Sequence, residues 1–241
     1  MKILLTGPSG RIGPYIIDNL RDQFEIVTFD LPGRGGDFDG DLSEIEPLRA
    51  AMRGVDAVVH LAATSDDAPF LEALVPNNII GTHNVFEAAR LEGVKRMVFA
   101  SSCQASGHVP TLEEDGVAVE VDLLPRPGNM YGASKVLGET MGWVYKSRYG
   151  MEFIALRLGA FQTYDSEWLK TGQAEEIWLS PRDCAHIIAL ALTKEGIKFA
   201  VVNATSKTSK EVLPLEGAAK ALGFEPQDDS KDFFSAHVFQ N

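Results

Sequence analysis

Three side chains of this sequence have the types and spacing that can remove a proton from an alcohol. Tyr131 and Lys135 stand four residues apart at the start of a predicted helix, which places both on one of its faces. An ammonium group beside a phenol favours the phenolate and lowers its pKa, so the pair suits a general base. Ser102 follows the apolar run 97–100, a predicted strand, where its hydroxyl would reach a substrate oxygen. Taken singly, the pair also fits a surface helix, and the serine fits a turn.

A glycine-rich turn near the first residue is typical of a dinucleotide-binding site. Gly7, Gly10 and Gly13 follow the apolar run 3–5 and open the amphipathic stretch 12–20, which predicts strand, turn and helix. The first glycine allows a tight turn, the second lets the backbone approach a pyrophosphate, and the third lets helix and strand pack closely. The helix start offers free N–H groups and a positive dipole end to the phosphates. The alternative is an ordinary βα turn without a ligand.

A carboxylate follows this turn where a ribose-binding residue is expected. Asp30 ends the second apolar run, 25–30, at about 20 residues from the turn. A carboxylate accepts hydrogen bonds from free ribose hydroxyls and repels a 2′-phosphate, so Asp30 predicts NAD. Arg34 follows closely in the sequence and could meet such a phosphate, which keeps NADP open as an alternative.

Short apolar runs alternate with helical patterns through most of the chain. The predicted strands are 3–5, 25–30, 57–61, 97–100, 153–158 and 199–202. Because they are apolar on both faces, they suit a parallel sheet covered by helices on both sides. The pattern predicts an α/β fold of the Rossmann type, a doubly wound parallel sheet with a small C-terminal substrate lobe. We expect a single domain over 1–241, mainly cofactor-binding in 1–158 and mainly substrate lobe, interleaved with the sheet, in 159–241.

Three stretches are expected to be loops, namely 31–40, 107–129 and 161–174. In open α/β sheets the ligand crevice lies outside the carboxyl ends of the strands. The last two stretches follow strand ends, so we expect them to line the substrate site.

Composition narrows the classes of function. The 241 residues carry a formal net charge of -12, which argues against a nucleic-acid partner and an anionic membrane surface. No run of about 18 apolar residues occurs, so no transmembrane helix is predicted, and no secretory leader is visible. Cys103 and Cys184 form neither a disulfide framework nor a metal-ligand pattern, and no metal is expected. We therefore expect a cytoplasmic protein with reduced thiols.

The order of glycine turn, Asp30, strand-end serine and Tyr-x-x-x-Lys resembles the short-chain dehydrogenase/reductase superfamily. It is most similar to the extended branch, the NAD-dependent epimerase/dehydratase family. The segment 60–63 resembles the cofactor-binding strand end of that branch, and 78–84 resembles its Asn-Val-x-Gly-Thr-x-Asn helix. Within the branch, the uronate dehydrogenases are the most similar. The segments that carry this similarity are 65–70, 77–90, 98–102, 126–135, 157–159 and 178–183.

The resemblance implies roles for the residues that match the family's motifs. The implied cofactor-binding residues are Gly7, Gly10, Arg11, Ile12 and Gly13 at the pyrophosphate, Asp30 at the ribose, Asp41 and Leu42 beside the adenine, Leu61, Ala62, Ala63 and Asn78 in the groove, and Tyr131 and Lys135 at the nicotinamide end. The implied catalytic residues are Tyr131 as base, Lys135 as the cation that lowers its pKa, and Ser102, which orients the reacting hydroxyl. The implied substrate contacts are Ser65, Ser102, Cys103, Gln104, Tyr131, Gly159 and Ala160.

The sequence departs from the uronate dehydrogenases in the expected substrate pocket. Cys103 and Gln104 replace an Asn-His pair after the serine, and Ala160 replaces a serine. Lys170 is the only cation in the stretch 159–171, and a lysine gives a point charge rather than a bidentate fork for a sugar carboxylate. A related sugar without that carboxylate is therefore an open alternative.

The resemblance implies NAD-dependent oxidation of a sugar hydroxyl, at C1 of a hexuronate or related aldose, to give the lactone. Two alternatives stay open: a nucleotide-sugar epimerase or dehydratase with tightly bound NAD, and a non-enzymatic NAD(P)-binding sensor. The short segment after Arg157 argues against the first, since it must grasp a nucleotide as well as a sugar. The resemblance also implies a homodimer formed by the helices expected near 69–90 and 133–149.

Overall fold

The computed structural model describes residues 1–66, 68–107 and 125–234. The strands are β1 (Lys2–Thr6), β2 (Glu25–Asp30), β3 (Phe38–Asp39), β4 (Ala57–His60), β5 (Arg96–Ser102), β6 (Glu152–Leu158), β7 (Ala160–Phe161), β8 (Trp178–Leu179) and β9 (Phe199–Ala204). The α-helices are α1 (Gly13–Leu20), α2 (Ile45–Met52), α3 (Gly81–Leu91), α4 (Met130–Tyr149), α5 (Glu167–Thr171), α6 (Pro181–Thr193), α7 (Glu216–Leu222) and α8 (Ser230–Phe233). Three further helical segments are η1 (Phe70–Ile80), a π-helix, and the 3-10 turns η2 (Cys103–Ala105) and η3 (Glu175–Ile177).

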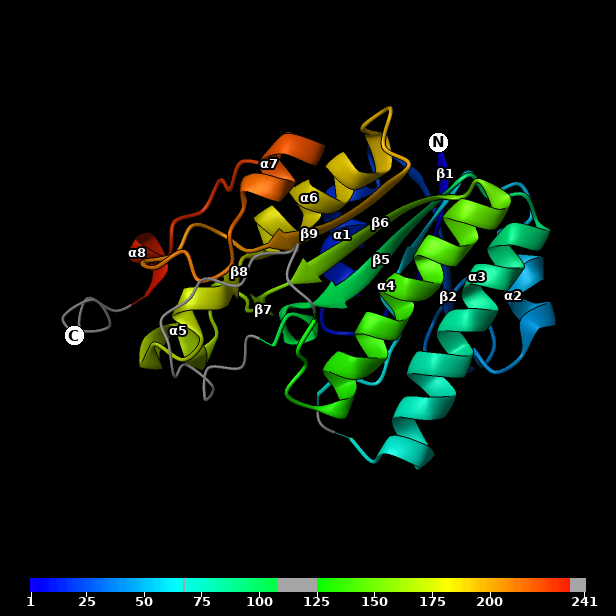
Figure 1. Ribbon diagram of the computed structural model, residues 1–241, viewed down its shortest axis with the longest axis horizontal. Coiled ribbons are helices and arrows are strands. Elements are labelled where there is room, and N and C mark those ends of the chain that lie inside the picture. Colours follow the sequence, from blue (N-terminus) through cyan, green and yellow to red (C-terminus); the bar gives the residue numbers. More distant parts are fainter. Residues whose placement is uncertain (67, 108–124, 235–241) are drawn as a thin grey trace.

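A seven-stranded sheet forms the centre of the molecule, with the strand order β3-β2-β1-β4-β5-β6-β9 (Figure 1). Every neighbouring pair is parallel. The chain begins at β1 in the middle, winds to one edge through β2 and β3, then crosses back and winds to the other edge. This order confirms the predicted doubly wound fold of the Rossmann type.

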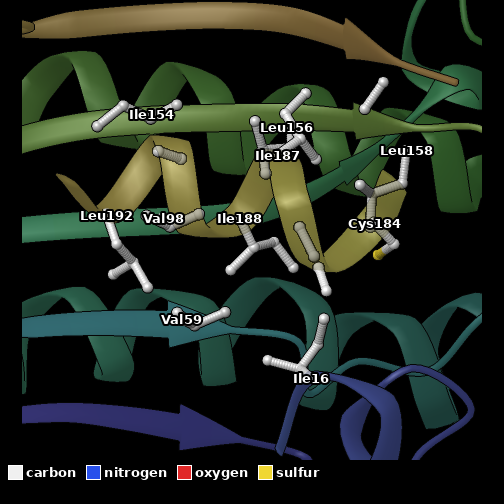
Figure 2. Packing of buried hydrophobic residues seen from close by; sticks show 14 of the residues in the cluster. Ile16, Val59, Val98, Ile154, Leu156, Leu158, Cys184, Ile187, Ile188 and Leu192 are labelled. Carbon is white, nitrogen blue, oxygen red and sulfur yellow. The ribbon is translucent and has the colours of Figure 1, made fainter. Parts of the chain in front are cut away.

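Helices cover both faces of the sheet, as Figure 1 shows. On one face α1, α6 and α7 share a buried core with the strands, and on the other α2, α3 and α4 do so. Ile187, Ile188 and Leu192 of α6 point from the helix onto the sheet (Figure 2). There they join a cluster with Val98 and Ile154, and all five side chains are at most 1% exposed. Each such side chain stabilises the fold by roughly 1.5–3 kcal/mol relative to full exposure.

The chain after β6 contributes to the sheet and also builds a separate wall. β9 is an edge strand of the main sheet, and α6 packs beneath it. Between β6 and α6 in the chain, β7 and β8 form a two-stranded parallel sheet beyond the carboxyl ends of the central strands (Figure 1). This small sheet and α5 lie where a ligand bound at the strand ends would meet them.

Two sequence-based expectations need correction, and a third falls partly outside the described residues. The stretch 161–174, expected to be a loop, holds α5, and the loop 31–40 holds β3. Such short elements have too few residues to display a hydrophobic period, so tertiary contacts decide them. The expected loop 107–129 lies outside the described residues from 108 to 124.

Candidate active site

A cavity of about 570 Å³ opens at the carboxyl ends of the central strands. Its wall combines the glycine turn, the segment after β4, the end of β5, the first turns of α4 and the chain from β6 to η3. The sequence-predicted residues in this wall are Gly7, Gly10, Arg11, Ile12, Gly13, Leu61, Ala63, Ser65, Ser102, Cys103, Gln104, Tyr131, Lys135, Gly159 and Ala160. The fold thus brings residues expected to bind cofactor, to catalyse and to contact substrate into one space.

Tyr131 and Lys135 lie on the first turns of α4, which a side chain caps. Asn129 accepts a hydrogen bond from the N–H of Gly132 at 2.8 Å, so the helix starts where the tyrosine must stand. Lys135 is buried, and its Nζ donates to the carbonyl of Ala100 at 2.9 Å. The same Nζ lies 5.5 Å from the centre of the Tyr131 ring. The cation is therefore held beside the phenol by the strand β5.

Burial shifts the pKa values of both members of this pair. Burial raises the pKa of the Tyr131 phenol, and the negative charge of Asp66 raises it further, against weaker opposing effects of Ser102 and Arg11. Burial also lowers the pKa of the Lys135 ammonium to about 8, opposed by Glu139. Both groups lie in a poorly solvated site that disfavours either charge, and the lowering of the Tyr131 pKa by Lys135 stays a prediction.

Ser102 ends β5 with its side chain buried in the wall of the cavity. Its Oγ accepts from the N–H of Gln104 at 3.2 Å and so caps η2. The Gln104 side chain accepts from Asn129 Nδ2 at 2.6 Å, which leaves its own amide N–H groups available for a ligand. Burial raises the pKa of the Cys103 thiol to about 11, so this cysteine is a neutral contact and not a thiolate nucleophile.

The glycine turn has the geometry that its spacing predicts. Gly7 has a φ of 71°, and a Cβ there would lie 2.8 Å from Ala62 Cα. A Cβ at Gly13 would lie 2.2 Å from the Pro8 carbonyl oxygen, so the turn can fold back on the helix only with glycine. Gly10 is exposed, and a Cβ there would approach only the Gly7 carbonyl oxygen, at 3.2 Å. Its outer side is thus open to a phosphate.

Asp30 lies at the end of β2 beside the glycine turn. Its carboxylate accepts from the N–H of Ser9 at 2.9 Å and from the N–H of Leu31 at 2.8 Å. These bonds fix the carboxylate at the edge of the turn, and it keeps acceptor positions for ribose hydroxyls.

Besides Asp30, four of the predicted cofactor residues lie outside the wall of this cavity. Ala62 packs beneath the glycine turn, and its N–H donates to Thr6 Oγ1 at 3.2 Å. Asp41 is exposed and caps the N–H of Ser43 at 2.8 Å, while the Leu42 carbonyl accepts from Asn84 Nδ2 at 2.9 Å.

Asn78 also departs from its expected contact. Its Oδ1 accepts from the N–H of Thr64 at 2.8 Å, and its Nδ2 donates to the Thr64 carbonyl at 2.9 Å and to Ser134 Oγ at 3.1 Å. Both amide protons are used, and the residue is 2% exposed. Asn78 thus ties η1 and the segment after β4 to the residue before Lys135, so its effect on a cofactor is indirect.

The cavity also contains residues that the sequence analysis did not single out. They are Asp66, Ala100, Ser101, Asn129, Leu158, Phe161, Gln162, Trp168, Ala174 and Ile177. Asp66 and Ala174 have φ values of 63° and 56° and are the only non-glycine residues with positive φ in the described part of the chain. Such strain gathers at functional sites. No local motif marks these residues, because folding brings them together from separate strands, helices and loops.

A buried ion pair supports the site from behind. Arg157 on β6 donates to both oxygens of Glu139 on α4, from Nε at 2.9 Å and from a terminal nitrogen at 2.8 Å. Ser101 Oγ donates to the same carboxylate at 2.6 Å. All three residues are at most 6% exposed. The pair fixes α4 against the strand that ends in Ser102.

Comparison with family models matches residues 3–164 to the NAD dependent epimerase/dehydratase family. The chain belongs to this family. The predicted family and the predicted similarity to uronate dehydrogenases are confirmed.

The relatives and solved structures align over nearly the whole chain. It is 31% identical to the NAD-dependent glucose-6-phosphate dehydrogenase of Haloferax volcanii, over 96% of this chain and 95% of that protein. It is 32% identical to the L-arabinose 1-dehydrogenase (NAD(P)(+)) of the same organism, over 95% of this chain and 97% of that protein. A mutant of the uronate dehydrogenase from Agrobacterium tumefaciens, solved with NAD, gives a TM-score of 0.80 at 27% identity, over 96% and 86% of the two chains.

The residues present fit a nicotinamide dinucleotide. The exposed Gly10 backbone, the start of α1 and Arg11 suit a pyrophosphate, and Asp30 suits a ribose with free hydroxyls. The described residues include no helix long and apolar enough to cross a membrane. Nor do these residues contain a cluster of side chains that could hold a metal ion.

Proposed function

We propose that this protein uses NAD to oxidise a sugar at its C1 hemiacetal hydroxyl, giving the lactone. The observation that carries the proposal is the convergence of Tyr131, Ser102 and Lys135 on one cavity that the glycine turn also lines. The three relatives named above are all sugar dehydrogenases and align with nearly the whole chain, which supports the same class of reaction.

The roles of the protein side chains follow from their positions. When bound, NAD supplies the hydride acceptor and a positively charged ring. Tyr131, as phenolate, takes the proton of the C1 hydroxyl, while Ser102 holds the same oxygen and orients the C1 hydrogen. Lys135 keeps a positive charge near the phenol, fixed in place by its bond to the Ala100 carbonyl. Asp30 at the adenosine ribose favours NAD over NADP.

NADH formation from a panel of aldoses, uronates and aldose phosphates tests the proposal. Replacing Tyr131 by phenylalanine should lower kcat by about 10²–10⁴-fold, the usual contribution of a positioned acid or base, while calorimetry shows NAD binding retained. Tyr149→Phe on the same helix is the matched control, because Tyr149 is 51% exposed and lies outside the cavity wall. Equal turnover by the two variants would remove Tyr131 from the mechanism.

The same panel of sugars distinguishes the proposed dehydrogenase from an epimerase and from a non-enzymatic sensor. NAD that survives dialysis, with sugar interconverted and no NADH released, would indicate an epimerase. Firm NAD binding without any turnover would indicate a sensor. A clear preference for NADP would contradict the role given to Asp30.

We also propose a homodimer formed through η1, α3 and α4, which lie side by side on one flank of the molecule (Figure 1). Large apolar side chains are exposed on these helices, and they are Leu71, Ile80, Leu91, Leu137, Trp143 and Val144. Burial of these exposed apolar side chains against a second copy of the chain would stabilise a dimer. Light scattering should give twice the chain mass of 26.2 kDa, and the mass of a single chain would contradict the proposal.

Both cysteines are free and buried, which supports a reducing, cytoplasmic setting.

A further inference from the structure

We propose that the sugar end of this cavity takes an uncharged aldose and discriminates against sugars that carry a carboxylate or a phosphate. The inference rests on the proposed function and names its substrate class. It stands on the charge and chemistry of the side chains in the wall.

The wall of the cavity outside the glycine turn is built from uncharged groups, one carboxylate and the buried ammonium of Lys135. Gln104 and Gln162 bring amides, Ser65 brings a hydroxyl, and Trp168 brings an aromatic surface. Amides and hydroxyls bond sugar hydroxyls as donors and acceptors, and an aromatic face packs against the C–H face of a sugar ring. This set recognises a neutral polyol.

The carboxylate in the wall belongs to Asp66. Its backbone is held in the left-handed region, with a φ of 63°, directly after Ser65. Its negative charge is felt at the reaction centre, since it raises the pKa of the Tyr131 phenol. A substrate carboxylate or phosphate in the same cavity would meet like charge, which costs binding energy and selects against anions.

Few positive charges of the chain reach this cavity. All 22 lysine and arginine residues fall within the described residues, since 67, 108–124 and 235–241 contain none. Within the described part of the chain, only Arg11 and Lys135 line the cavity. Arg11 belongs to the glycine turn, and its effect on the pKa of Tyr131 is weaker than that of Asp66. Lys135 is buried, and its Nζ donates to the Ala100 carbonyl.

Lys170 is the cation that the sequence analysis considered for binding a sugar carboxylate, but it lies outside the cavity. It lies on α5 with a side chain 64% exposed, and it pairs with Glu167 at 2.6 Å. An anionic sugar would therefore lose hydration without gaining a counter-charge in the described wall.

Sugars that differ only in the group on C5 provide the test. D-Galactose, D-galacturonate and L-arabinose share their remaining stereocentres, and D-glucose, D-glucuronate and D-glucose 6-phosphate form a second series. In one series or both, we expect kcat/KM for the neutral members to exceed that for the anionic members by at least about tenfold, the penalty expected of like-charge contact. A uronate or a sugar phosphate as the best substrate overturns the inference.

A charge variant and its control link the preference to Asp66. Asp66→Asn should raise the ratio of anionic to neutral kcat/KM by about fivefold at low ionic strength, the size of one screened charge interaction at contact distance. Asp165→Asn, an exposed carboxylate outside the cavity wall, should leave the ratio unchanged. An unchanged ratio in Asp66→Asn, or an equal change in both variants, overturns the role of Asp66 and with it the inference.

Calorimetric binding of the same sugars to the enzyme saturated with NADH separates this inference from the proposed function. Neutral sugars that bind without ever being oxidised would support the substrate class and refute the reaction. Tighter binding of the anionic sugars would refute the substrate class whatever the turnover. Binding of neither kind would refute both.

Discussion

Replacing Glu139 by leucine should lower the free energy of unfolding by about 3–5 kcal/mol, the usual cost of stranding one member of a buried ion pair. Glu139 accepts two hydrogen bonds from Arg157, at 2.9 and 2.8 Å, and the two side chains are only 8% and 3% exposed. One terminal nitrogen of this arginine already lacks a hydrogen-bond partner among the described residues, so no spare acceptor can compensate the loss. For a chain of this size, the midpoint of thermal unfolding should fall by about 6–20 °C.

A double variant supplies the decisive comparison. Adding Arg157→Met to Glu139→Leu removes the stranded charge and fills its place with an apolar side chain, so most of the lost stability should return. Urea unfolding of the wild type, both single variants and the double variant gives the coupling energy. If the double variant is as unstable as Glu139→Leu, the side chains do not act as a pair and the reasoning is refuted.

The same variants separate support of the fold from support of the chemistry. Glu139 raises the pKa of Lys135, against a burial that lowers it to about 8. In the refolded double variant this pKa should therefore fall further, and the ammonium form should be lost at lower pH. As pH is raised, activity that needs the ammonium form of Lys135 should therefore begin to decline at a lower pH in the double variant than in the wild type. Identical profiles of kcat against pH would show that Glu139 serves the fold alone.

Three more outcomes follow from buried or crowded groups. Lys135→Met should abolish turnover yet raise the free energy of unfolding by roughly 3 kcal/mol at neutral pH, because the variant no longer buries an ammonium group. The pKa of Lys135 is about 8 in the folded protein against 10.5 for a free lysine, so this gain should shrink as pH rises from 8 to 10.5 in denaturant titrations. Burial lowers the pKa of His60 from 6.5 to about 3, so the neutral imidazole gives its full contribution to stability above pH 6.5, and up to roughly 5 kcal/mol is lost as pH falls toward 3. His60→Gln should flatten this dependence of the unfolding free energy on pH, and an unchanged dependence would assign it to other groups. Gly13→Ala should cost about 1–3 kcal/mol in thermal unfolding and weaken NAD binding. Gly217→Ala in α7 should gain about 0.5–1 kcal/mol, because a Cβ there would lie 4.0 Å from its nearest neighbour, Val202 Cγ1.

Local patterns predicted the parts of the site that one short stretch of chain determines. The glycine turn follows from the spacing of Gly7, Gly10 and Gly13, because a Cβ at each of these positions would crowd backbone atoms of the turn or of the neighbouring segment. The face shared by Tyr131 and Lys135 follows from helix geometry alone. The parallel sheet follows from strands that are apolar on both faces.

Contacts between distant segments explain what the sequence could not reveal. The raised pKa of Tyr131 depends on burial and on the charge of Asp66, which no spacing of residues predicts. The amide of Asn78 serves Thr64 and Ser134, a contact that exists only once η1 packs on α4. Gln162 and Trp168 reach the cavity from a region that the sequence presents as a loop.

The electrostatics of the cavity bear on the base of the proposed reaction. Burial and the charge of Asp66 raise the pKa of the Tyr131 phenol, which favours its neutral form. A positive charge beside the phenol has the opposite effect, and Lys135, held by its bond to the Ala100 carbonyl, is placed to supply one. Of the two redox forms of NAD, only the oxidised form carries a positive charge on its nicotinamide ring. When bound, oxidised NAD would therefore favour the phenolate of Tyr131 more than NADH would.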